Sequence, residues 1–280
     1  MTTFSLLVTA WAWEPSVWIG GLVLLLAYAG ALHFQLNSAA WWFIAGVGLM
    51  VWALIGPLDV LGDGYLFSAH MLQHLVLILA VAPCLLLGLP QASRQALMRW
   101  SWTRRIEQML GRPLLAWSLH TGTVWLWHLP VLYEAALRHE AIHIVQHLTF
   151  LITAVIFWWP LFAPNGPLRR SSLLALLYLF GSALASSVLG IILTFATVNL
   201  YPTYLYPRDP LHILPLLRVR WGLSSALDQQ MGGLFMWVVG GLVYLLAMMG
   251  ALARWYSGPA DTTSARPTNR INREGVSDAA

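Results

Sequence analysis

The sequence predicts an all-α integral membrane protein: a bundle of about seven transmembrane helices with the N-terminus outside and the C-terminus in the cytoplasm. Of its 280 residues, 59% are hydrophobic and only 9% are charged, and the mean hydropathy is +0.68. Ordinary soluble proteins carry about 25% charged residues. Apolar runs extend from near residue 17 to near residue 252 with no polar domain between them. We therefore expect a single multispan membrane domain over residues 1–255.

The expected spans follow from length, because a helix needs roughly 20 apolar residues to cross the hydrocarbon core. Seven segments fit, at about 16–36, 40–58, 67–89, 113–132, 141–163, 171–198 and 227–252. The fourth is the least regular, since it contains His120, His128 and Pro130, and it can run into a short helix at 133–138. Residues 256–280 lack apolar periodicity and are rich in polar residues, which predicts a mobile cytoplasmic tail.

The orientation follows from arginine, which supplies all fifteen cationic residues. Eleven fall on one side of a seven-span arrangement: Arg94, Arg99, Arg104, Arg105, Arg112, Arg169, Arg170, Arg254, Arg266, Arg270 and Arg273. Short cytoplasmic loops of membrane proteins are enriched in arginine, so this side is predicted to be cytoplasmic. The loop at 91–110 is expected to lie along the inner headgroups and to contact anionic lipid. The positive charge therefore reflects topology and lipid, and we expect no nucleic acid partner.

Several classes of protein are excluded or disfavoured by what the sequence lacks. The absence of lysine excludes a retinal Schiff base, which a seven-span chain would otherwise suggest. Cys84 is the only cysteine, so there is no disulfide framework and no CxxC motif. No Walker motif, GxSxG elbow or Rossmann fingerprint occurs. We therefore expect a protein that is not an enzyme.

The candidate functional residues are histidines at one depth near the outer face. His70 and His74 lie in the first two turns expected of the third span, and His143 and His147 repeat the same spacing at the start of the fifth. Residues four apart project from one side of a helix. His128 lies in the last turn expected of the fourth span, which also ends outside. Five of the nine histidines are thus predicted to share one layer.

Such a layer predicts a metal site, because ionisable residues in spans are costly and face the bundle interior or a cavity. Imidazole suits copper, zinc, iron and nickel, and soft thioethers at Met71 or Met231 would favour Cu(I). Asp228 could orient an imidazole from behind the ligands. A polar interhelical network is the alternative interpretation of the same residues. The other four histidines are predicted to have packing roles: His33, His120, His139 and His212.

Four stretches resemble the CtaG family of cytochrome c oxidase assembly proteins: HMLQHLVLILAVAPCLLLGLP, WHLPVLYEAAL, HIVQHLTFLITAVIFWWP and DQQMGGLFMWVVGGLVYLLA. The resemblance runs from about residue 58 to 252, with the motifs in order. It implies a bacterial multispan protein of the plasma (inner) membrane that matures the copper centres of the oxidase. The family's histidine motifs fall on His70, His74, His128, His143 and His147. Cys84 and Val239 depart from its pattern, because each stands where the family commonly has proline.

The resulting hypothesis is a membrane accessory protein that binds copper, as Cu(I), at its outer face and delivers it to an assembling terminal oxidase. The expected partners are an oxidase subunit or its assembly intermediates. One alternative is a haem-binding electron-transfer protein, because facing histidines can be axial ligands. Another is a metal or proton transporter, with His120 continuing a path inward. The nearly apolar inner halves of the third and fifth spans argue against transport.

Overall fold

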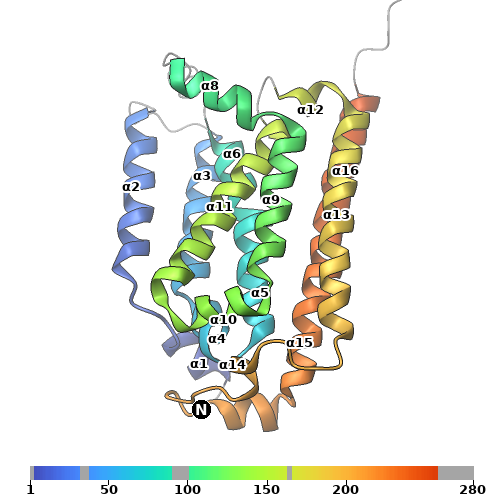
Figure 1. Ribbon diagram of the computed structural model, residues 1–280. Helices are drawn as coiled ribbons and strands as arrows, with labels where there is room; N and C mark the ends of the chain where they lie inside the picture. Colours follow the sequence, from blue (N-terminus) through green and yellow to red (C-terminus); the bar gives the residue numbers. More distant parts are fainter. Residues whose placement is uncertain (1–2, 32–37, 90–100, 163–165, 258–280) are drawn as a thin grey trace, which may run out of the picture.

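The computed structural model describes residues 3–31, 38–89, 101–162 and 166–257, and all regular structure in these ranges is helical. The α-helices are α1 (Thr3–Thr9), α2 (Pro15–Ala31), α3 (Ala40–Ile55), α4 (Pro57–Gly64), α5 (Phe67–Val76), α6 (Ala82–Gly88), α8 (Ser101–Leu110), α9 (Pro113–Trp127), α10 (Pro130–Arg138), α11 (Glu140–Phe162), α12 (Pro167–Arg170), α13 (Ser172–Phe195), α14 (Pro202–Leu205), α15 (Ser225–Leu234) and α16 (Gly240–Tyr256). Three π-helical turns join them: η1 (Leu77–Val81), η2 (Pro215–Arg220) and η3 (Phe235–Val239). The long helices form a bundle, with shorter helices at its two ends (Figure 1).

Four continuous helices of the described chain are long and apolar enough to cross a membrane: Phe67–Gly88, Glu140–Phe162, Ser172–Phe195 and Ser225–Tyr256. Helices α3 and α4 form a fifth if this pair, bent by 41° at Gly56, counts as one span. Each of the seven expected spans contains a helix. However, α2 has 17 residues and α9 has 15, which at 1.5 Å per residue is less than the roughly 30 Å of hydrocarbon. The structure therefore supports four or five spans by length and composition.

The short helices are sorted between the two ends of the bundle (Figure 1). Helices α8 and α12 lie at the same end as the last residues of α16, whereas α1, α4, α10 and α14 lie at the opposite end. Arg104, Arg105, Arg169 and Arg254 therefore lie at one end, which the arginine pattern predicts to be cytoplasmic, whereas Arg208 and Arg218 lie at the opposite end, near α4 and α14. The expected tail lies outside the described residues from residue 258 onward, as does the first half of the 91–110 loop.

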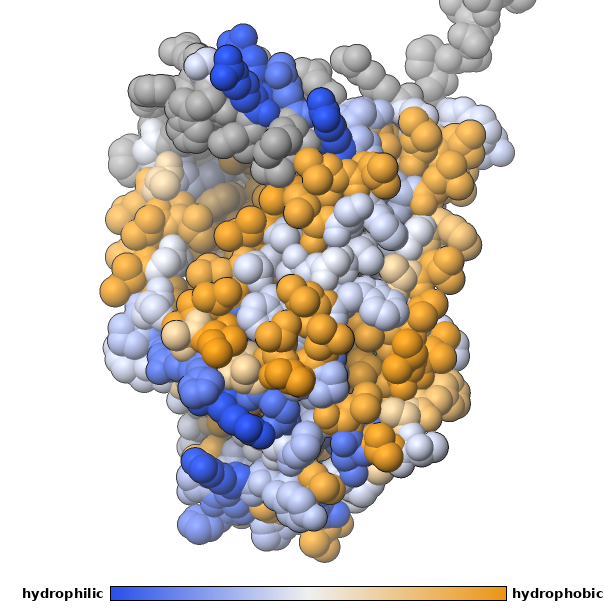
Figure 2. All heavy atoms as spheres, in the orientation of Figure 1, coloured by the Kyte–Doolittle hydropathy of each residue, from blue (hydrophilic) through white to orange (hydrophobic). Residues whose placement is uncertain are grey.

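Apolar side chains cover much of the surface of the bundle (Figure 2). Leucines at 177, 184 and 246 are each more than half exposed on the outward faces of α13 and α16. Hydrophilic residues gather toward the two ends in this view (Figure 2). Exposed apolar surface on this scale indicates contact with lipid rather than water.

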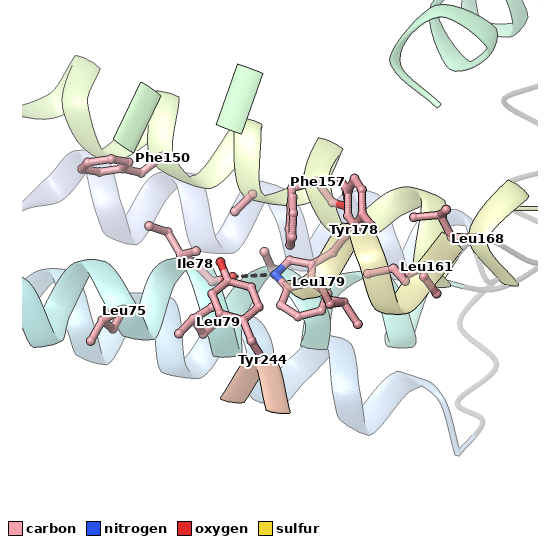
Figure 3. Close-up of a cluster of buried hydrophobic side chains, with 14 of the residues drawn as sticks. Leu75, Ile78, Leu79, Phe150, Phe157, Leu161, Leu168, Tyr178, Leu179 and Tyr244 are labelled. Carbon is pink, nitrogen blue, oxygen red and sulfur yellow. Dashed lines mark hydrogen bonds between the residues drawn. The ribbon is translucent and has the colours of Figure 1, made fainter. Parts of the chain in front are cut away.

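A large apolar cluster runs along the interior of the bundle and is formed mainly by η1, α11, α13 and α16, with residues of α5, α6, α9, α10 and α12 (Figure 3). Phe157, Trp158 and Leu179 are almost fully buried in it. The indole N–H of Trp158 donates to the carbonyl oxygen of Ile78 at 2.9 Å, inside the wide turn η1. The π-helical turn precedes Pro83, which cannot donate a backbone hydrogen bond. The indole thus satisfies a buried carbonyl at the point where the helix ladder is irregular.

Candidate metal centre

The first turn of α5, which carries His70, is held by a buried carboxylate. Asp228 Oδ2 accepts the backbone N–H of Phe67 at 2.8 Å, and its Oδ1 accepts the N–H and the hydroxyl of Ser68 at 3.0 and 2.6 Å. A carboxylate at a helix N-terminus satisfies free N–H groups and opposes the positive end of the helix dipole. In the described contacts, Asp228 thus acts on His70 through the start of α5, and its expected contact with an imidazole stays a prediction.

Helix α4 packs closely against α5 at Gly62. A Cβ atom on Gly62 would lie 3.0 Å from both the Cα and the backbone nitrogen of His70, so only glycine fits without a shift. The Tyr204 hydroxyl donates to the carbonyl oxygen of Gly62 at 2.7 Å. Burial raises the pKa of Tyr204 well above its usual value, so the phenol stays protonated and keeps this role as donor. The contact fixes the distance between α4 and the first histidine.

The two histidine pairs face each other across the α5–α11 interface. The ring centroids of His70 and His74 are 4.3 Å apart, and those of His143 and His147 are 4.2 Å apart. Between the helices, His70 lies 5.4 Å from His143 and His74 lies 5.2 Å from His147. The structure therefore brings together the four imidazoles that their shared depth and spacing predict.

Several nitrogen atoms of these rings are buried without a hydrogen-bond partner. They are both ring nitrogens of His70, both of His74, and the Nε2 atoms of His143 and His147. Buried polar groups are normally paired, so a group of unpaired imidazole nitrogens needs an explanation such as an ion or a water molecule. Two trios have all their ligand atoms within 4.8 Å of one another: His70, His74 and His147, and Asp63, His70 and His143. Three ligands of this type fit a transition metal.

Asp63 is a site residue that the sequence analysis does not predict. Its Oδ1 atom is 3.4 Å from His143 Nε2 and 3.7 Å from His70 Nδ1, and it is buried without a hydrogen-bond partner. The residue lies in α4, which the bend at Gly56 turns toward the start of α5. The sequence does place an acidic residue at the depth of the histidines. However, the contact of Asp63 with His70 and His143 depends on the bend at Gly56, which the sequence does not reveal.

His128 and Met71 lie together, apart from the two trios. His128 is the C-cap of α9; its Nδ1 lies 2.6 Å from the carbonyl oxygen of Val124 and its Nε2 lies 3.3 Å from Met71 Sδ. His128 therefore already has partners for both ring nitrogens. The described contacts join the sulfur of Met71 to His128. Met231 is half-buried on α15, and the described contacts do not join it to an imidazole.

The other histidines differ from these four. His120 is buried, and its Nδ1 lies 3.3 Å from the hydroxyl of Thr153, as expected of a packing residue. His139 and His212 are exposed at the C-cap of α10 and in the segment before η2. His33 lies outside the described residues.

A cavity of about 40 Å³ is lined by His74, His120 and His128. Its volume is enough for about one to three water molecules.

These features define the class: a helical membrane protein with a cluster of four imidazoles and one carboxylate buried near one end of its bundle. The family to which the chain belongs follows from its sequence. Residues 22–258 match the model of the cytochrome c oxidase caa3 assembly factor, Caa3_CtaG, and the chain belongs to this family.

Similar curated proteins come from mycobacteria. Uncharacterized proteins of Mycobacterium bovis and Mycobacterium tuberculosis are each 22% identical over 279 residues, covering 90% of this chain and 40% of the relative. One from Mycobacterium leprae is 22% identical over 271 residues, covering 88% of this chain and 40% of the relative. The chain thus spans about two fifths of the length of these relatives. No solved structure matches it significantly.

Proposed function

We propose that this assembly factor holds one copper ion in the buried histidine cluster and passes it to a cytochrome c oxidase that is being assembled. The observation that carries the proposal is the convergence of unpaired imidazole nitrogens in two trios that share His70. Membership in an oxidase assembly family supplies the acceptor. The oxidase or an assembly intermediate would contact the end of the bundle where the cluster lies, which the arginine pattern predicts to be the outer end.

The chemistry of the cluster favours Cu(I). The trio of His70, His74 and His147 offers three neutral nitrogen ligands in a buried site. Burying an uncompensated charge is costly, and the cost is lower for a monovalent than for a divalent ion. Imidazole is a suitable ligand for copper. Delivery would proceed by ligand exchange, in which each imidazole is replaced in turn by a ligand of the acceptor, so the oxidation state of the ion does not change.

The haem alternative has less support from the geometry. The imidazole centroids that contact each other in the cluster lie only 4.2 to 5.9 Å apart, and the neighbouring cavity of about 40 Å³ is far smaller than the roughly 300 Å³ or more typical of organic ligand sites. A path through the bundle also has less support, because buried apolar side chains, including Phe157, Trp158 and Leu161, pack in its interior (Figure 3). These observations favour a bound ion over a porphyrin or a transport route.

Metal analysis of the purified protein tests the proposal. Wild type loaded with Cu(I) and freed of excess metal should retain about one copper per chain. The double variant His70→Ala/His74→Ala should retain none, because each trio loses at least one ligand. His120→Ala is the matched control, since it removes a buried imidazole that already has a hydrogen-bond partner. Equal copper in the double variant and the control, or a Soret band in the purified protein, would refute the proposal.

Anionic lipid is proposed as a second partner, at the end of the bundle that carries α8. Arg104 and Arg105 of this helix are exposed, and its sequence SWTRRIEQML places polar and apolar residues on different faces. Basic amphipathic helices of this kind lie along anionic headgroups. The contact would hold this end at the membrane surface while the histidine cluster remains at the other end.

A further inference from the structure

A surface depression leads to the histidine cluster from the end of the bundle that carries α1 and α4. It has a volume of about 440 Å³, and Trp11, Asp63, Tyr65 and Arg208 are among the residues that line it. These residues come from the chain after α1, from α4 and its C-cap, and from the segment between α14 and η2. The depression is therefore open to the surroundings, and it meets the cluster at Asp63.

Asp63 belongs to both the depression and the cluster. Its side chain is 41% exposed on the depression, yet its Oδ1 is buried within reach of His143 Nε2 and His70 Nδ1. The His143 side chain is 14% exposed, and the His70 side chain is fully buried. The exposed fraction of the side chain thus decreases from Asp63 to His143 and then to His70.

His70 joins the two trios. It is the only residue shared by the Asp63, His70, His143 trio and the His70, His74, His147 trio, and both of its ring nitrogens lack a partner. His70 could therefore serve as a ligand in both positions of the ion, because a neutral imidazole can bind a metal through either nitrogen, depending on its tautomer. The ion would exchange Asp63 and His143 for His74 and His147 as it moves from the first trio to the second.

We propose that Asp63 is the receiving ligand of a two-step relay, in which the first trio captures a copper ion from the depression and the second trio holds it. This inference rests on the proposed function, because it assigns an order to ligands within that site. During capture, the bonds between the ion and its donor break as the Asp63 carboxylate and the imidazoles of His70 and His143 bind it. Transfer breaks the bonds to Asp63 and His143 as bonds to His74 and His147 form, with no change in oxidation state. Once bound, the carboxylate partly neutralises the charge of the cation, and any proton that the carboxyl group carried is released to the water in the depression.

The relay predicts that Asp63 controls rates more than equilibrium affinity. The test mixes the purified full chain in detergent with Cu(I) held by a coloured chelator, and follows both loading and removal by stopped-flow absorbance. Asp63→Asn should slow both rates by about tenfold or more, the effect expected when a charge-assisted interaction of about 1.5–3 kcal/mol is lost from a transition state. The dissociation constant should change much less, because both directions pass through the same trio. Asp63→Glu keeps the charge and should stay closer to the wild-type rates.

The control is Glu140→Gln, which removes an equal charge from the first residue of α11, one turn before His143, without touching either trio. It should load at close to the wild-type rate. His74→Ala should weaken the final affinity while leaving the initial capture rate close to that of wild type. Circular dichroism of each variant confirms that the helices are retained.

The outcomes separate this inference from the proposed function. If wild type takes up no Cu(I), the proposed function itself fails. If wild type takes up copper and Asp63→Asn does so at the same rate, or no more slowly than Glu140→Gln, the relay is wrong and the copper site stands. If a folded Asp63→Asn variant loses copper at equilibrium as completely as His70→Ala/His74→Ala, Asp63 is a permanent ligand and the relay is also wrong.

Discussion

Gly62 shows how one missing side chain positions the cluster. Its Cα lies against the backbone of His70, so α4 approaches α5 closely enough for Asp63 to reach two imidazoles. No sequence signal distinguishes Gly62 from Gly64, because both stand in LGDGY next to the same aspartate. The pairs of histidines were predictable since their i, i+4 spacing is a local property. Asp63 was not, since its contact is made across the bend between two helices.

Gly62→Ala tests this close approach. The added Cβ would meet the backbone of His70 at 3.0 Å, so α4 must move away and the Asp63, His70, His143 trio must open. We expect a loss of about 1–3 kcal/mol of stability, which is typical of overpacking, together with slower copper loading. Gly64→Ala is the control, because a Cβ there meets nothing within 4 Å. Thermal unfolding and loading kinetics should change for the first variant only; equal behaviour of the two would contradict the account.

The first turn of helix α5 is stabilised by hydrogen bonds to a residue from a distant part of the chain. Asp228 lies in α15, about 160 positions later, and accepts three hydrogen bonds from the first two residues of α5. The sequence indicates a carboxylate at the right depth but cannot show which donors it meets, since the pairing arises from the packing of α15 on α5. The same applies to α4: the expected second span ends near residue 58, whereas the helical chain continues to Gly64 after a bend.

Asp228→Ala should therefore act on α5 as a whole. Removing this cap leaves the N–H groups of Phe67 and Ser68 buried without an acceptor, at a cost of about 1–3 kcal/mol. Copper affinity should fall as well, since His70 lies in the turn that loses its cap. Ser224→Ala removes the exposed cap of α15 and should cost about 1 kcal/mol or less. Unfolding and copper titration of both variants provide the measurement, and a milder effect of Asp228→Ala than of Ser224→Ala would rule out this role.

At the scale of the molecule, the bundle separates a histidine end from an arginine end. The segments that bear α8 and α12 lie opposite those that bear α4, α10 and α14 (Figure 1). Composition and apolar runs predict the helical membrane fold well, because lipid imposes the same requirement along every span. They predict the number of spans less well, since α2 and α9 are shorter than the apolar runs suggest. The segment between α13 and α15, which carries Tyr201 and Tyr204 into the core, has no periodic pattern that would reveal its packing.

The orientation of this bundle can be tested with single cysteines in a Cys84→Ala background, because Cys84 is the only native cysteine. Tyr206→Cys lies at the histidine end and Arg169→Cys at the arginine end, and both native residues are exposed. A membrane-impermeant maleimide added to intact cells should label the first position, and should label the second only after permeabilisation. The reverse pattern would place the histidine cluster on the cytoplasmic side and contradict delivery at the outer face.

The central claim is that imidazoles of the buried cluster bind copper. X-ray absorption spectroscopy at the copper edge of the Cu(I)-loaded protein tests it most directly, because it reports both the oxidation state and the ligand atoms. The account predicts a Cu(I) edge, nitrogen ligands and the multiple scattering of imidazole rings in wild type and in His120→Ala. It predicts loss of this signal in His70→Ala/His74→Ala. A spectrum with only sulfur ligands, or an imidazole signal that persists unchanged in the double variant, would contradict it.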